Sequence, residues 1–313
     1  MKKQVKKIIT LMLILSLSLM TVTGCTTSTN QEGEKAPGET PDNSSAENQP
    51  TDSSDKVLLT VSFGTSYNDN RDLSIGAIEK ALQKAYPDYQ IRRAFTSQII
   101  IDKLKERDNL EIDNVTEAMD RLVADGIKEV VIQPTHVMNG YEYDDVISEV
   151  TPYEDNFESL KIGKPLLTSD ADYEKIVSVI TEETKSYDTD TTAIVFMGHG
   201  TEHEANAVYS KLQQYITDAD HSNYFIGTVE ATPSLDDVVA LVKESGAAKV
   251  VLTPFMIVAG DHANNDMAGD EEGSWKNAFE AEGFEVECIL KGLGEYKGVQ
   301  DMIVDHAGEM INQ

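Results

Sequence analysis

The chain has 313 residues, of which 55 are acidic and 26 are basic, so its formal net charge is −29. This excess of negative charge argues against a nucleic-acid partner and against electrostatic binding to anionic lipid. The simplest interpretation of the charge is solubility outside the cytoplasm, although an acidic surface also raises the local concentration of cations.

The first 24 residues have the pattern of an export signal. Four lysines lie within residues 2–7, and an apolar run from Ile8 to Met20 follows them. This run is short for a transmembrane helix but typical of a signal peptide. It ends in Val22-Thr23-Gly24-Cys25, which resembles a bacterial lipobox. We therefore expect a signal peptide over 1–24, lipidation of Cys25 and a chain anchored to the outside of the cell membrane. The alternative is a plain signal peptide with a chance cysteine.

Residues 25–55 are expected to form a flexible linker behind the lipidated cysteine. Residues 26–55 contain no aromatic residue and no Val, Ile, Leu or Met, so the segment cannot bury enough apolar surface to fold. Removal of the leader would leave 22 basic and 55 acidic residues, a net charge of −33. It would also leave Cys288 as the second cysteine beside a lipidated Cys25. Any metal ligands should then be histidines and carboxylates.

From residue 56 onward, short Val/Ile/Leu runs alternate with helical patterns. Continuous apolar runs are typical of strands that are buried on both faces of a parallel sheet. The sequence therefore predicts an α/β fold with doubly wound parallel sheets. The predicted strands are Val57–Phe63, Tyr89–Ala94, Glu129–Gln133, Thr192–Met197, Tyr224–Val229, Lys249–Pro254 and Glu285–Leu290.

Two of the intervening helices have clear start and stop signals. In the first, Val115, Met119, Leu122 and Val123 share one face, after Asp113 or Asn114 as N-cap and before Gly126. In the second, Thr232 is the expected N-cap and Pro233 the first-turn proline. The apolar face of that helix is Leu235, Val238, Val239 and Val242, and Gly246 ends it.

These two helix–strand units match each other at an offset of 120 residues. Five identities fall in the window, pairing Gly126, Val130, Val131, Pro134 and Gly140 with Gly246, Val250, Val251, Pro254 and Gly260. We predict two similar α/β halves, residues 56–170 and 188–313, with a cleft between them. Interfaces of this kind and the carboxyl ends of parallel strands are favoured ligand sites.

Two histidine loops follow predicted strands in the second half. Gly198-His199-Gly200-Thr201 comes directly after one apolar run, and Gly260-Asp261-His262-Ala263 follows another. Glu230 lies where a third strand ends. Two histidines and one carboxylate are a common ligand set for a first-row divalent ion with open coordination positions. The sequence therefore predicts a metal site of His199, Glu230 and His262, although a lone loop histidine is more often structural.

The remaining histidines receive weaker assignments. His136 is expected to face the cleft from the first half as a substrate contact. His203 would share a helical face with His199 only if a helix began by Gly200, and is expected to be exposed or to lie behind the metal ligands. His221 and His306 are expected to be solvated surface residues. No Walker loop is present, which argues against the use of ATP.

The chain resembles the anaerobic-type sirohydrochlorin cobaltochelatases, the single-subunit class II chelatases, over about residues 57–310. The longest matching stretch runs from Val258 to Ala268, and Gly273-Ser274-Trp275-Lys276 follows it at the family's spacing. The other matching stretches are Val61–Tyr67, Arg93–Ser97, Phe196–Gly200 and Gly227–Glu230.

The resemblance implies a chelatase-like fold and the insertion of Co²⁺ into sirohydrochlorin without ATP. Position by position, it assigns His199 and His262 as metal-binding histidines and Glu230 as the acidic residue of the site. We expect all three to be catalytic, with His199 as both base and ligand. The expected walls of the tetrapyrrole pocket are Phe63, Gly64, Thr65, Phe95 and Met256.

The expected export is a departure from the family, because cobalamin precursors are made in the cytoplasm. The alternative function is a surface-anchored haem- or metal-binding lipoprotein for tetrapyrrole or iron uptake, which would use the same cleft. The ligand set also accepts Fe²⁺, Ni²⁺ and Zn²⁺. The sequence leaves the oligomeric state open, a homo-oligomer included.

Overall fold

A computed structural model describes residues 55–313, which belong to one compact unit. The predicted signal peptide, Cys25 and nearly all of the predicted linker lie outside the described residues. No helix within the described part of the chain is both long and apolar enough to cross a membrane.

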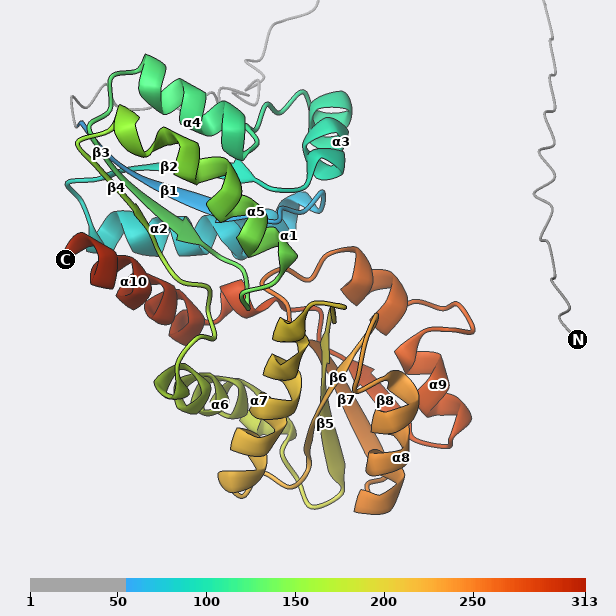
Figure 1. Ribbon diagram of the computed structural model, residues 1–313. Coiled ribbons are helices and arrows are strands. Elements are labelled where there is room, and N and C mark those ends of the chain that lie inside the picture. The colour runs from blue at the N-terminus through green and yellow to red at the C-terminus, as the bar shows by residue number, and fades with distance from the viewer. Residues whose placement is uncertain (1–54) are drawn as a thin grey trace, which may run out of the picture. The chain divides into compact units, whose positions relative to one another are not determined.

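The strands form two parallel sheets of four, with the same strand order in each (Figure 1). The first sheet has the order β2-β1-β3-β4 and the second the order β6-β5-β7-β8. The predicted duplication is therefore visible in the topology. The strands are β1 Lys56–Ser62, β2 Gln90–Phe95, β3 Glu129–Pro134, β4 Ser159–Ile162, β5 Thr192–Gly198, β6 Tyr224–Thr228, β7 Lys249–Pro254 and β8 Glu285–Cys288.

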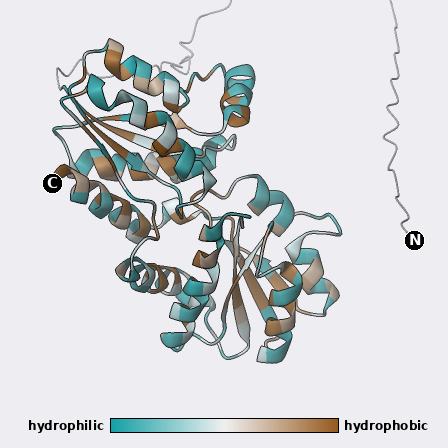
Figure 2. Cartoon of the chain, viewed as in Figure 1, coloured by the Kyte–Doolittle hydropathy of each residue, from teal (hydrophilic) through white to brown (hydrophobic). Residues whose placement is uncertain are grey.

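The seven predicted strands are present, and β4 is the one that the sequence patterns missed. β4 has only four residues, Ser-Leu-Lys-Ile, none of them fully buried, so it lacks the apolar run that marks the others. Figure 2 shows the contrast between the hydrophobic central strands and the mixed surfaces of the helices.

The α-helices cover both faces of each sheet. They are α1 Asn68–Leu73, α2 Ile75–Ala85, α3 Gln98–Asp108, α4 Val115–Ala124, α5 Tyr141–Val150, α6 Asp170–Thr184, α7 Ala207–Asp218, α8 Leu235–Ser245, α9 Trp275–Ala281 and α10 Lys297–Ile311. Short 3₁₀ or π-helical turns are η1 Thr151–Asn156, η2 Lys185–Tyr187, η3 Glu204–Asn206, η4 Ala263–Met267 and η5 Leu293–Glu295.

Alternation along the strands determines which helices each face meets. In β1, Val57, Leu59 and Val61 pack with α4 and α5, whereas Leu58 joins the cluster that contains α2, α6 and α10. In β5, Ala193, Val195 and Met197 pack with α8 and α9, whereas Ile194 and Phe196 face α6 and α7. The cluster of Leu58 and Ile194 thus spans both halves.

The last helix departs from the predicted boundary of the second half, 188–313. α10 packs against α2 and β3 of the first half and against α6. Its buried residues, among them Met302, Ile303 and Ala307, complete the core cluster on the Leu58 face of β1. The chain therefore crosses between the halves twice, because its final apolar helix covers the first sheet.

Local signals decide the helix starts. Asn114 caps α4, because its side chain accepts a hydrogen bond from the Glu117 N–H at 2.8 Å. The sequence predicted Thr232 as the N-cap of α8, and this prediction is wrong. The N-cap is Ser234, because it forms a reciprocal capping box with Asp237. Gly126 and Gly246 occupy equivalent positions after α4 and α8, with φ of +71° and +77°.

His306 was predicted to be solvated, and this prediction is wrong. It is only 4% exposed, and its Nε2 lies 2.9 Å from Oδ1 of Asp172, which is also buried. The two residues join α10 to the start of α6. Burial raises the pKa of Asp172, but hydrogen bonds from His306 and from the N–H groups of Thr168 and Ser169 outweigh it and lower the pKa to about 2.

We expect this carboxylate to stabilise the fold at neutral pH but not in acid. Its folded pKa is below the unfolded value, so its stabilisation, about 2 kcal/mol, is present above about pH 4 and disappears between about pH 4 and 2. In urea unfolding, Asp172→Asn should lower the free energy of unfolding at pH 6, and this deficit should shrink by pH 3. A deficit that stays constant from pH 6 to 3 would contradict the assignment.

Candidate metal centre

The carboxyl ends of β5, β6 and β7 bring the three predicted ligands together. His199 follows β5, Glu230 follows β6, and His262 follows the loop after β7. One ligand atom from each side chain lies within 4.8 Å of the other two. The side chains of His199, Glu230 and His262 remain 44%, 57% and 31% exposed, so a ligand can reach them.

The backbone places Glu230 beside His199. Beyond the ends of β5 and β6, the ladder continues as the N–H of Val229 donates to the carbonyl of Gly198 and that of Glu230 to the carbonyl of His199. Oε2 of Glu230 then lies 3.8 Å from Nδ1 of His199. The imidazoles of His199 and His262 meet edge to face, with their centroids 4.6 Å apart.

Hydrogen bonds orient both imidazoles in the same way. Nδ1 of His199 lies 2.8 Å from the carbonyl oxygen of Gly200, and Nδ1 of His262 lies 2.7 Å from Oδ2 of Asp266. A carbonyl or carboxylate oxygen accepts, so Nδ1 is the protonated nitrogen of each neutral ring. The Nε2 lone pairs of both histidines are therefore available to bind a metal or a proton.

Asp266 is a site residue that sequence reasoning missed. It lies in η4, four residues after His262, and its carboxylate completes the carboxylate–histidine pairing that often supports metal ligands. The His-x-x-x-Asp spacing was the available signal, because residues four apart share a face in a helical turn.

Two glycines and a tyrosine hold the loop of His199. A Cβ on Gly198 would lie 2.2 Å from the ring of Tyr209, and Gly200 has φ of +85°. The hydroxyl of Tyr209 accepts a hydrogen bond from the N–H of Gly200 at 3.2 Å. Burial raises the pKa of Tyr209 to about 12, so the phenol stays neutral. Tyr209 was also missing from the predicted site.

His203 does not belong to the group of three candidate ligands. No helix begins at Gly200, and the next helical turn, η3, starts at Glu204. Nδ1 of His203 accepts from the N–H of Ala205, while its Nε2 lies 3.4 Å from Oδ2 of Asp144 in α5. His203 therefore connects the loop after β5 to the first half of the fold.

The expected pocket residues divide into accessible and buried groups. Phe63 is 48% exposed, and Met256 is partly buried. Gly64 and Thr65 are buried, and Thr65 lies against the loop of His262, because a Cβ on Gly260 would be 3.3 Å from its Oγ1.

Phe95 does not line the site as predicted. It is fully buried with Ile75, Ile101 and Leu104, and its ring would meet a Cβ on Gly64 at 2.6 Å. The ring of Phe95 packs against the backbone of Gly64. Gly64 has φ of +98° and no Cβ, which allows this close contact.

His136 lies just beyond the end of β3 and is partly buried. Both of its ring nitrogens are buried and lack a hydrogen-bond partner. Burial lowers the pKa of His136 to about 4, so the imidazole is neutral at pH 7. Its predicted contact with substrate remains a prediction.

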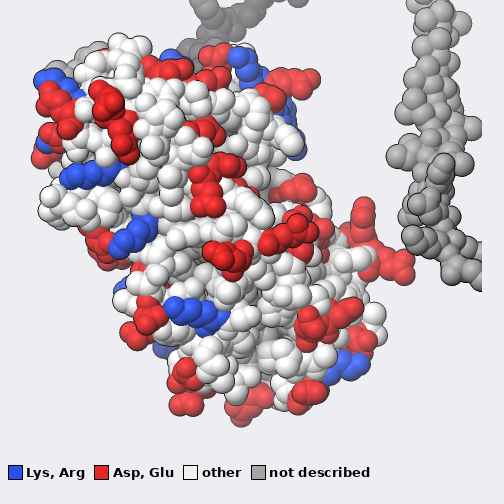
Figure 3. All heavy atoms as spheres, viewed as in Figure 1, with Lys and Arg blue, Asp and Glu red and all other residues white. Residues whose placement is uncertain are grey.

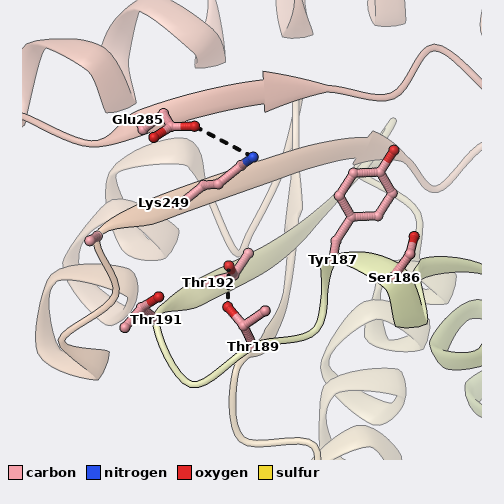
Figure 4. Close-up of a pocket in the computed structure, with 8 residues that line it drawn as sticks. Ser186, Tyr187, Thr189, Thr191, Thr192, Lys249 and Glu285 are labelled. Atoms are coloured by element: carbon pink, nitrogen blue, oxygen red, sulfur yellow. Dashed lines mark hydrogen bonds and ion pairs between the residues drawn. The ribbon is translucent and has the colours of Figure 1, made fainter.

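A hollow of about 630 Å³ adjoins the His262 loop. It lies between α1 and α3 on one side and residues around Ala259, Asn264 and Leu290 on the other. We call it the α1–α3 hollow. A smaller hollow of about 360 Å³ lies at the opposite ends of the strands, beside the first residues of β5, β7 and β8 (Figure 4). There Lys249 pairs with Glu285 and Glu287, and no metal-site residue takes part.

Comparison with known families assigns the chain to the chelatases. The cobalt chelatase (CbiK) family model matches residues 56–312. The sirohydrochlorin cobaltochelatase of Salmonella typhimurium is 40% identical over 257 residues, which cover 82% of this chain and 97% of that protein. The sirohydrochlorin cobaltochelatase CbiKC of Nitratidesulfovibrio vulgaris is 30% identical over 253 residues, covering 80% and 89%.

Solved structures support the fold. SirB from Bacillus subtilis with Fe³⁺ has a TM-score of 0.57 at 11% identity, covering 82% of this chain and 95% of that one. A chelatase-like multi-domain protein from Deinococcus radiodurans has a TM-score of 0.53 at 12% identity, covering 81% and 55%. The sequence matches over nearly all of the described residues show that this chain belongs to the CbiK cobalt chelatase family.

Proposed function

We propose that this protein is a sirohydrochlorin cobaltochelatase, which inserts Co²⁺ into sirohydrochlorin without ATP in anaerobic cobalamin synthesis. The observation that carries the proposal is the meeting of two imidazoles and one carboxylate at the carboxyl ends of β5, β6 and β7. The relatives that share the family carry this activity in their names.

The three side chains suit the capture of the substrate metal. His199 and His262 offer neutral nitrogen ligands, and Glu230 offsets part of the positive charge of Co²⁺. Three protein ligands leave coordination positions for water and for the pyrrole nitrogens. The partial exposure of all three side chains allows the metal to be handed over.

Metal insertion also requires the removal of the pyrrole N–H protons. We assign His199 as the principal proton acceptor, because histidine is the most frequent general base and the Nε2 of His199 is free. Glu230, 3.8 Å from the same ring, is a second acceptor and stabilises the imidazolium that forms. Phe63, Met256 and His136 are the proposed contacts to the macrocycle.

Asp266 should strengthen the metal ligand His262. Its carboxylate accepts from Nδ1 and so holds the ring in the orientation that leaves Nε2 for the metal. We expect Asp266→Ala to weaken Co²⁺ binding and insertion by roughly 10–100-fold. The matched control is Asp270→Ala, which removes a nearby carboxylate that is 96% exposed. Equal effects of the two substitutions, measured by cobalt titration and turnover, would contradict this role.

Incubation of the purified protein with sirohydrochlorin and Co²⁺ tests the function directly. We expect the absorption shift of metal insertion without added ATP. Parallel reactions with Fe²⁺, Ni²⁺ and Zn²⁺ measure metal preference, for which we propose Co²⁺ as the physiological substrate. Tight haem binding without turnover would overturn the proposed enzymatic function and favour a role in tetrapyrrole uptake.

We further propose that the chain is exported and anchored through a lipid on Cys25. The lipobox-like Val22-Thr23-Gly24-Cys25 and the apolar run before it support this location. Metabolic labelling with a radioactive fatty acid should mark the wild-type protein, whereas Cys25→Ala should remain unlabelled and leave the membrane fraction. Labelling of the Cys25→Ala protein would contradict the anchor.

A further inference from the structure

We infer that the α1–α3 hollow is a subsite for the peripheral carboxylates of the tetrapyrrole, with Lys103 as the cation that binds them. The inference rests on the proposed function, because it assigns a specificity determinant to the same substrate. It concerns residues outside the metal ligands and outside the pocket walls expected from the sequence.

The hollow directly borders the metal-binding loop. Ala259 and Asn264, which flank the segment containing His262, both line it. On the opposite side, Oη of Tyr67 lies 3.5 Å from Oδ1 of Asp261. A macrocycle whose centre lies at the three ligands would therefore extend an edge toward the hollow. The volume of about 630 Å³ is in the range of small-molecule sites.

The lining combines apolar and cationic groups, as a carboxylate-rich macrocycle requires. Leu73 and Leu290 line the hollow and remain 57% and 46% exposed, so both offer apolar surface to a ligand. Lys103 and Arg107 lie four residues apart on α3 and both line the hollow. Leucine side chains suit the flat apolar faces of a tetrapyrrole, and the cations suit its charged rim.

Both cations of the hollow lie in a protein with an excess of acidic residues. Its net charge is −29, and red acidic side chains are spread over the face drawn in Figure 3. Two carboxylates, Asp69 and Glu295, also line the hollow. Glu295 is engaged, because its Oε1 accepts from the N–H of Gly292 and the side chain of Asn70.

The two cations have different roles. Arg107 donates to the carbonyl of Ser66 at 2.7 Å and to Oδ1 of Asn68 at 3.0 Å, and it pairs with Asp108. It is thus a positioning residue that holds the loop before α1. Lys103 is exposed and forms no ion pair with another residue of 55–313. Its ammonium group is therefore available to a carboxylate of the ligand.

Binding of metal-free sirohydrochlorin to the full-length protein tests this subsite. We expect Lys103→Ala to raise the Kd roughly fivefold and Lys103→Glu to raise it roughly twentyfold, with kcat within about twofold of wild type. The matched control is Lys175→Glu on α6, because Lys175 is also exposed and does not line the hollow. This control should leave the Kd nearly unchanged.

A second readout separates carboxylate binding from a structural effect. Uroporphyrin carries more peripheral carboxylates than coproporphyrin, and wild-type protein should prefer the former. Lys103→Ala should reduce that preference, and added salt should weaken binding to wild type more than to the variant. An unchanged Kd in Lys103→Glu, or an equal rise in Lys175→Glu, would overturn the subsite.

The outcomes also distinguish the subsite from the proposed function. If wild type binds sirohydrochlorin in a Lys103-dependent way but does not insert cobalt, the subsite is supported and the proposed enzymatic function is overturned. Normal cobalt insertion with a Kd that is insensitive to Lys103 would overturn the subsite and leave the enzyme intact.

Discussion

His199→Ala is expected to reduce the rate of cobalt insertion by at least about 100-fold, because one substitution removes a ligand and the proposed base. Its Nε2 lone pair is free, and its ring meets both Glu230 and His262. Alanine leaves no nitrogen at this position, and water does not replace an oriented imidazole. The absorption change of sirohydrochlorin with Co²⁺, followed at saturating concentrations of both, gives kcat directly.

The matched control is His221→Ala. His221 is a partly buried histidine before β6, in edge-to-face contact with Tyr224 and remote in the topology from the carboxyl ends of the strands. It should retain nearly full activity. The His199 side chain is 44% exposed, so we do not expect folding to require it. Thermal unfolding of both variants should therefore give melting temperatures close to that of the wild type. Full turnover by His199→Ala would refute its role.

Gly200→Ala should also abolish most activity, although Gly200 is not one of the three proposed ligands. Gly200 has φ of +85°, and a Cβ there would lie 2.8 Å from the backbone nitrogen of Ala231 and 2.9 Å from Cβ of Thr228. The loop would have to move away from the end of β6, which would separate His199 from Glu230. We expect a loss of at least about tenfold in kcat/KM, in keeping with the steep cost of misplacing catalytic groups.

Gly246→Ala separates this displacement from backbone strain alone. Gly246 has a similar φ of +77°, but a Cβ there meets nothing within 4 Å. It should lose roughly 1 kcal/mol of stability and keep its activity. Urea unfolding and turnover on both variants make the comparison. Equal activity in the two variants would show that the tight packing around Gly200 does not position His199.

Periodicity and repetition in the sequence were sufficient for much of the fold. Seven strands follow from apolar runs, and the match at an offset of 120 residues predicted the repeated topology seen in the two sheets. Residues 129–134 form β3 and residues 249–254 form β7, and the two strands share an apolar pattern. They occupy the same place in their sheets, because β3 pairs with β1 and β7 pairs with β5. Short signals were less reliable, as β4 and the start of α8 show.

The sequence likewise identified some residues of the site and not others. His199, Glu230 and His262 were identifiable because each follows a strand, and parallel strands end at one edge of a sheet. Tyr209 was not, because its role depends on the direction in which a neighbouring loop turns, whereas Asp266 was overlooked although its spacing from His262 was a signal. Phe95 was assigned to the pocket by its place after β2, yet its side chain packs inward beneath Gly64.

By itself, the sequence determined the class of fold, its duplication and the three residues that could bind a metal, because these depend on local periodicity and on order along the chain. The tertiary structure alone decided which nitrogen of each imidazole is free, that α10 returns to cover the first sheet, and that Lys103 lines the same hollow as Ala259 and Asn264. These features depend on contacts between residues that are far apart in sequence, and no local pattern specifies such contacts.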